Sequence, residues 1–224
     1  PTVVDLSKPA NLVHHEGVEE EHEHEHGEEA SDGASATASA AATAQASEAE
    51  HDEHGHDEHA EGGEGHDGDL DPHFWLDPDR MIKVAEALEA SFAKIDPANA
   101  NDYKAGLDKL KTALTGVDNQ YKQGFTSCQH KTFITSHAAF GYMAERYGLT
   151  QASISGIDPE TEPSPAEMAN IKSVVEKTGV KTIFTEELVS DAPAKAIAAE
   201  TGAETSVLSP LESKPERGDY TDAM

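Results

Sequence analysis

Hydrophobic periodicity first separates a helical middle from the rest of the chain. Apolar side chains recur every three or four positions from residue 81 to 95, and a second stripe runs from residue 103 to 121. This spacing places apolar side chains on one face of a helix. Asp77 suits the N-cap of the first helix and Pro78 suits its first position. The pattern predicts two successive amphipathic helices, and the second opens at Pro97.

After residue 124, short β-branched runs alternate with helical patterns. The strand-like runs are residues 131–136, 151–157, 181–185 and 204–209. The helical patterns are residues 138–148, 165–178 and 192–201. This alternation predicts an α/β fold, with a parallel sheet and helices on both faces. In such sheets ligands bind outside the carboxyl ends of the strands, so the loops after the strands are where we expect a site.

The N-terminal part reads differently. Residues 2–6 alternate and are β-branched, which predicts a short strand. Residues 14–69 lose all periodicity and run through His/Glu, then Ala/Ser/Thr, then His/Asp/Glu/Gly. Such a stretch has almost no apolar mass to offset the entropy lost on ordering, so we expect a disordered loop.

Charge is concentrated in the same stretch. The chain has 224 residues and a net charge of −28, and residues 14–69 hold 19 of its 44 acidic residues and 10 of its 13 histidines. An acidic chain repels nucleic acid and anionic lipid and suits a cationic ligand. No apolar run reaches the roughly 20 residues that a membrane-spanning helix needs. The first residues read as a strand already begun and the last as a helix just starting, so we expect an internal piece of a longer protein.

Only three histidines lie outside the acidic stretch. His73 stands directly before the capped helix, His137 directly follows a predicted strand, and His130 lies in a polar turn where we expect a surface position. Imidazole at such borders can point one nitrogen into a crevice while the other is held by a neighbour. From position alone, His73 and His137 are equally well read as hydrogen-bonded structural histidines. The single cysteine, Cys128, is either a buried thiol or the partner of a cysteine outside this sequence.

Three motifs together carry a family resemblance. "DPHFWLDP", "TSHAAFGYMAERYGL" and "ISGIDPETEPSP" follow one another in this order. They resemble the zinc-specific substrate-binding proteins of ABC transporters, the ZnuA-like members of cluster A-I. The resemblance covers nearly the whole chain and implies two α/β lobes joined by one long helix, with the metal between the lobes. It assigns a first-lobe strand to residues 1–13, a His-rich loop to 14–69, the end of the first lobe to 70–95, the connector helix to 96–124 and a truncated second lobe to 125–224.

The resemblance also assigns metal ligands. His73 and His137 match two histidine ligands of the family, and a histidine rather than a glutamate at position 137 indicates zinc. A further histidine ligand of the family would precede this sequence. The late-loop position, often an aspartate in relatives, is Ser209 in "LSPL". Because a neutral serine is a poor zinc ligand, we expect water, a nearby carboxylate or a loop histidine to complete the tetrahedron.

Carboxylates at strand ends are the candidates to support the ion. Glu162 and Asp158 lie in "GIDPETEPSP", and Glu186 and Glu187 follow another predicted strand. Negative charge there would help to hold a divalent cation between neutral imidazoles. The same residues are equally well read as turn-forming or solvated acids.

The acidic histidine stretch offers many pairs of nitrogens but no single preorganised geometry. We therefore expect weak auxiliary metal sites there, with a solvated spacer as the alternative. The histidines concerned are His22, His24, His26, His51, His54, His56, His59 and His66.

The resemblance implies extracytoplasmic capture of Zn²⁺ and its delivery to an ABC permease, without covalent chemistry. It implies a monomer, periplasmic or extracellular, with or without a lipid anchor, which takes zinc free or from a zinc metallochaperone. Two rival functions remain open. One is a metal-buffering or adhesive surface protein that acts through its histidine stretch. The other is a zinc hydrolase with Glu162 as general base, against which the sequence has no HExxH pairing.

Overall fold

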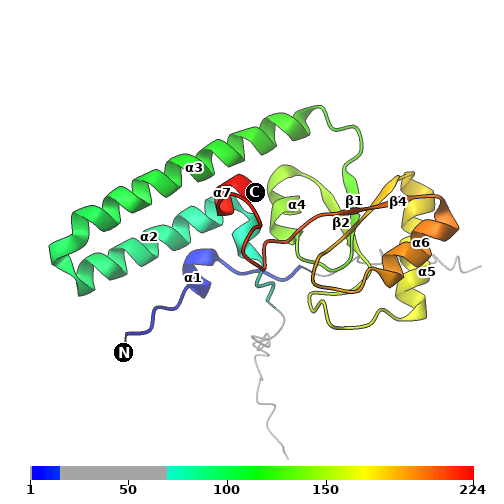
Figure 1. The fold of residues 1–224 in the computed structure, drawn as a ribbon, viewed down its shortest axis with the longest axis horizontal. Coiled ribbons are helices and arrows are strands. Elements are labelled where there is room, and N and C mark those ends of the chain that lie inside the picture. Colours follow the sequence, from blue (N-terminus) through cyan, green and yellow to red (C-terminus); the bar gives the residue numbers. More distant parts are fainter. Residues whose placement is uncertain (1, 16–69) are drawn as a thin grey trace, which may run out of the picture. The chain divides into compact units, whose positions relative to one another are not determined.

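The structure, a computed structural model, describes residues 2–15 and 70–224 (Figure 1). Its α-helices are α1 (Ser7–Ala10), α2 (Pro78–Ile95), α3 (Ala100–Thr126), α4 (Gly141–Tyr147), α5 (Pro165–Thr178), α6 (Ala192–Thr201) and α7 (Tyr220–Ala223). Two 3₁₀ helices, η2 (Phe74–Leu76) and η3 (Pro97–Asn99), and the strands β1 (Thr132–Thr135), β2 (Thr150–Ser153), β3 (Thr182–Thr185) and β4 (Glu204–Val207) complete the described elements. None of these helices has the length and apolar character required to cross a bilayer.

The two predicted amphipathic helices are confirmed as α2 and α3, which lie side by side as a hairpin joined by η3 (Figure 1). The side chain of Asp77 accepts hydrogen bonds from the backbone N–H groups of Asp79 and Arg80 at the start of α2. This cap satisfies donors that a helix N-terminus otherwise leaves without partners. Pro97 opens the turn that leads into α3. The sequence pattern therefore predicted both the N-cap of α2 and the position at which the chain leaves the first helix and enters the second.

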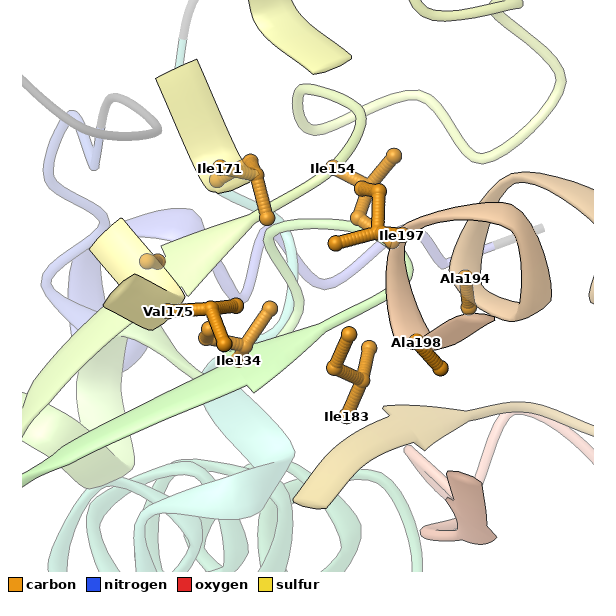
Figure 2. Close-up of a cluster of buried hydrophobic side chains, with 9 residues drawn as sticks. Ile134, Ile154, Ile171, Val175, Ile183, Ala194, Ile197 and Ala198 are labelled. Carbon is orange, nitrogen blue, oxygen red and sulfur yellow. The ribbon is translucent and has the colours of Figure 1, made fainter. Parts of the chain in front are cut away.

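The strands form one parallel sheet, as predicted, and the structure gives their order as β2-β1-β3-β4. Successive strand residues point to opposite faces, so Ile134 and Phe133 serve different cores. Figure 2 shows Ile134 and Ile183 of the sheet facing Ile171 of α5 and Ile197 of α6. On the other face, Phe133 packs against a cluster formed by Leu76, Ala139 and Phe140. The two layers of packing hold the carboxyl ends of β1, β3 and β4 at one edge.

The expected strand at residues 2–6 is wrong. These residues have no strand structure, Val3 is 88% exposed, and the first element is the short helix α1. A strand needs a partner, and every strand among the described residues pairs within the sheet of β1 to β4. Arg80 anchors the end of α1 instead, because its guanidinium donates to the carbonyl oxygens of Ala10 and Asn11.

Two smaller expectations concern the turn before β1 and the acidic stretch. His130 is exposed, as expected, and the half-buried thiol of Cys128 donates to its carbonyl oxygen at 2.9 Å. The proposed loop with its auxiliary histidines lies, from residue 16 to 69, outside the described residues. The division of the chain into first lobe, connector and second lobe stays a prediction.

Candidate metal centre

Three side chains from distant segments converge at the carboxyl ends of the strands. His73 directly precedes η2, His137 follows β1, and Glu212 lies in the loop after β4. The two histidines are 3% and 1% exposed, and their Nε2 atoms lie 3.4 Å apart. The Oε1 atom of Glu212 lies 3.3 Å from Nε2 of His73 and 3.4 Å from Nε2 of His137. The three atoms form a small triangle of donors that face one point.

Each histidine is held from behind by one buried carboxylate. Oδ1 of Asp71 lies 2.7 Å from Nδ1 of the His73 ring. The same oxygen accepts a hydrogen bond from the backbone N–H of His73 at 2.9 Å. For His137, Nδ1 lies 2.6 Å from Oε2 of Glu186 as an ion-pair contact without hydrogen-bond alignment, while the backbone N–H donates to Oε1 at 3.1 Å. Such partners favour the proton on Nδ1, which leaves the Nε2 lone pair free to bind a cation.

The loop that carries His137 is fixed by its own hydrogen bonds. The carbonyl oxygen of His137 accepts from the hydroxyl of Thr135 at 2.7 Å and from the side-chain amide of Gln151 at 3.1 Å. The backbone N–H of Ala138 donates to the carbonyl oxygen of Gly156 at 2.9 Å. Because β1 and β2 supply these groups, the ring of His137 is held before any ligand arrives.

The loop that carries Glu212 is fastened to η2. The indole N–H of Trp75 donates to the carbonyl oxygen of Pro210 at 2.8 Å, and the hydroxyl of Tyr220 donates to the carbonyl oxygen of Trp75. Leu211 has a φ of 58°, in the left-handed region that branched side chains rarely adopt. Backbone strain of this kind costs of order 1–3 kcal/mol and clusters at binding sites. Here it turns the chain so that Glu212 faces the histidines.

Charge around the imidazoles is predominantly negative. Burial by itself would raise the pKa of Asp71, but hydrogen bonds from His15 and His73 outweigh it and hold that pKa below its usual value. Burial would lower the pKa of His137, but the carboxylates of Glu186 and Glu212 outweigh it and raise that pKa. Protonation of His137 therefore competes with the binding of a metal cation at its Nε2 atom.

The triangle has the dimensions of a tetrahedral zinc site. Its edges are 3.3, 3.4 and 3.4 Å. Donors at tetrahedral angles and zinc distances of about 2.0–2.1 Å would be separated by about 3.3–3.4 Å. The arrangement can therefore hold one ion equidistant from all three atoms, with a fourth position left for water or another donor.

The other candidates from the sequence lie elsewhere. The hydroxyl oxygen of Ser209 accepts a hydrogen bond from the backbone N–H of Leu211 at 3.3 Å. Asp158 is exposed and accepts from the backbone N–H of Glu160 at 2.9 Å. Glu162 is exposed and lines a pocket of about 530 Å³ beside His137. Neither Asp158 nor Glu162 belongs to the group of donors that converge, whereas Ser209 lines a small pocket together with Glu186 and Glu212.

Sequence reasoning missed two functional carboxylates. Glu212 was not predicted, because the family pattern points to Ser209. Glu212 is nevertheless the first acidic residue after "LSPL". Asp71 was not predicted either. The only indication of its role in the sequence is its position two residues before His73. Of the two glutamates after β3, Glu186 is buried against His137 and Glu187 is exposed.

A parallel α/β sheet beside a long helix is the fold of the two-lobed solute-binding proteins. The family model of ZnuA, described as zinc-uptake complex component A periplasmic, matches residues 2–224. The chain therefore belongs to the ZnuA family, and the resemblance drawn from its motifs is confirmed.

Individual relatives agree with the family. The zinc-binding protein AdcA of Streptococcus pyogenes serotype M6 is 42% identical over 154 residues, which are 69% of this chain and 30% of that protein. The crystal structure of the laminin-binding protein Lbp of Streptococcus pyogenes matches with a TM-score of 0.67 and 39% identity, over 69% of this chain and 61% of that one. A Zn(II)-bound glutamate-to-glutamine variant of AdcAII of Streptococcus pneumoniae matches with a TM-score of 0.65 and 34% identity, over 69% and 56%. The chain thus spans about a third of the curated relative's length.

Proposed function

We propose that the protein binds one Zn²⁺ tightly through His73 Nε2, His137 Nε2 and Glu212 Oε1 and delivers it to the permease of an ABC transporter. The observation that carries this proposal is the triangle of donors with edges of 3.3–3.4 Å, the spacing of a tetrahedral zinc site. Zinc is borderline-soft, and two imidazoles with one carboxylate are among its usual protein ligands. Asp71 and Glu186 behind the rings supply further negative charge for the dication.

The site suits a carrier because it combines rigid and accessible ligands. The two histidines are almost fully buried, whereas the side chain of Glu212 is 27% exposed. We infer that the ion enters and leaves on the side of Glu212. Withdrawal of that one carboxylate would lower the affinity and assist transfer to a partner. The cargo is the ion itself, so the site needs no group that makes or breaks covalent bonds.

Location and partner follow from the family rather than from the fold. The family is described as a periplasmic zinc-uptake component, and the curated relative is a zinc-binding protein. We therefore propose an extracytoplasmic protein, periplasmic or at the cell surface, that acts beside a permease. A zinc hydrolase is the weaker alternative, because Glu162, its general base, is exposed and outside the group of three donors.

A second candidate function is adhesion or metal buffering through the histidine stretch. Adhesion is favoured by two relatives of known structure, which are laminin-binding proteins. This candidate and the carrier make opposite predictions for the stretch. An adhesive or buffering protein needs the stretch for its binding, whereas a carrier with a preorganised site does not.

Deletion of residues 17–68 tests the two candidates. The backbone N–H of Asp71 donates to the carbonyl oxygen of Val13 at 2.9 Å, so a short glycine linker can join the ends. We expect fewer zinc ions per molecule and less than a tenfold change at the tightest site, since a flexible segment must lose entropy on binding. Calorimetric zinc titration measures both quantities. Loss of the tight site on deletion would make the stretch the binding site and remove the basis of the carrier function.

A further inference from the structure

His15 belongs to the predicted loop of residues 14–69 and is its last described residue before position 16, and it shares a carboxylate with the metal ligand His73. Nδ1 of His15 lies 2.7 Å from Oδ2 of Asp71, while Oδ1 of the same carboxylate meets Nδ1 of His73 at 2.7 Å. The side chain of Asp71 is fully buried. One carboxylate therefore bridges two imidazoles that lie far apart in the sequence.

The position of His15 is fixed by the residues that pack around its ring. A Cβ atom at residue 141 would lie 2.4 Å from Cγ of His15, so the ring fits only because Gly141 has no side chain. The ring stands edge-on to Tyr142 with centroids 4.4 Å apart, and its Nε2 lies 3.6 Å from a carboxylate oxygen of Glu145. His15 is only 18% exposed in its side chain.

Tyr142 fastens the backbone on both sides of this contact. Its hydroxyl donates to the carbonyl oxygen of Asp71 at 2.7 Å and accepts from the backbone N–H of Val13 at 2.9 Å. The backbone of Asp71 is thus fixed by Tyr142. The side-chain oxygen Oδ2 still needs its own donor, because a buried carboxylate oxygen without one costs free energy.

We propose that His15 is a positioning residue for the metal ligand His73. By donating to Oδ2, it fixes the plane of the Asp71 carboxylate, and Oδ1 then fixes the direction and tautomer of the His73 ring. This inference rests on the proposed function and adds a residue to it.

The test compares His15→Ala with His15→Asn in the complete protein. His15 supports Asp71, and Asp71 in turn supports the ligand His73. Loss of a supporting residue of this kind typically lowers metal affinity about 10- to 100-fold, and we expect about tenfold for His15→Ala. Asparagine keeps an N–H donor near Oδ2, so His15→Asn is expected to restore most of the affinity. Competition with a zinc chelator measures the tightest site, and the visible spectrum of one equivalent of Co²⁺ reports its geometry. We expect an altered Co²⁺ spectrum for His15→Ala and a near-native one for His15→Asn.

Controls separate this inference from the proposed function. His130→Ala removes an exposed histidine and is expected to leave zinc affinity unchanged. An unchanged zinc affinity and an unchanged Co²⁺ spectrum in His15→Ala would overturn the role of His15. The role would also be overturned if His15→Ala and His15→Asn lost zinc affinity equally while their melting temperatures were equal. A tight site that survives His73→Ala would instead overturn the proposed function.

Discussion

Replacing His137 with alanine is expected to weaken the tightest zinc site by about 100-fold or more. Zinc sites with four protein ligands have apparent binding free energies of about 10–16 kcal/mol, so one ligand contributes roughly 3 kcal/mol, and each 1.4 kcal/mol is tenfold in affinity. The substitution also leaves the buried carboxylate of Glu186 facing an emptied space in place of the imidazole that it contacts at 2.6 Å. The loop after β1 is held by its own hydrogen bonds, so we do not expect it to move and bring another donor into the vacated position.

Chelator competition on the purified protein measures this loss. His130→Ala is the matched control, since it removes a histidine from an exposed turn a few residues earlier. The weak zinc ions attributed to residues 16–69 should remain in both variants. An affinity for the first zinc ion within threefold of the original protein in His137→Ala would show that the ion is held elsewhere.

Replacing Glu212 with alanine is expected to weaken the same site by at least tenfold, whereas Ser209→Ala changes it by less than threefold. Glu212 supplies the third donor and the only negative charge within 3.4 Å of both Nε2 atoms among the described residues. The effect should be smaller than that of His137→Ala because the side chain is 27% exposed, so water can occupy the vacated position. Ser209 only accepts a hydrogen bond from Leu211 within the turn.

Glu212→Gln separates charge from shape in this prediction. The amide keeps the length of the side chain and an oxygen donor but loses the negative charge, so its affinity should lie between those of the original protein and Glu212→Ala. Rates of zinc release to a chelator should follow the same order, since Glu212 is the exposed ligand. Equal losses in Ser209→Ala and Glu212→Ala would mean that the loop acts through its shape and not through a ligand.

Local patterns predicted the regular elements of this fold well. The residues of α5 and α6 were predicted at the bounds that the structure has, because proline stands at the first or second position of each helix and glycine follows its last residue. The Asp77 cap likewise marked the start of α2. The strand predicted at residues 2–6 was wrong because alternating β-branched residues only indicate a preference for extended structure. A strand also requires a neighbouring strand, which the local pattern does not identify.

The candidate site was only partly predictable for a similar reason. His73 and His137 stand at element borders inside recognisable motifs, so local sequence marks them. Glu212 reaches them through the docking of its loop on Trp75, a contact across more than a hundred residues that no periodicity encodes. The same holds for His15 and Asp71, which lie 56 residues apart in the sequence.

Anomalous diffraction at the zinc edge, from crystals of the protein loaded with one equivalent of Zn²⁺, tests the central claim most directly. We predict one strong peak at about 2.0–2.2 Å from His73 Nε2, His137 Nε2 and Glu212 Oε1, the distances of tetrahedral zinc. A zinc peak bound by other residues, with His73 and His137 still in contact through their Nε2 atoms, would contradict the claim.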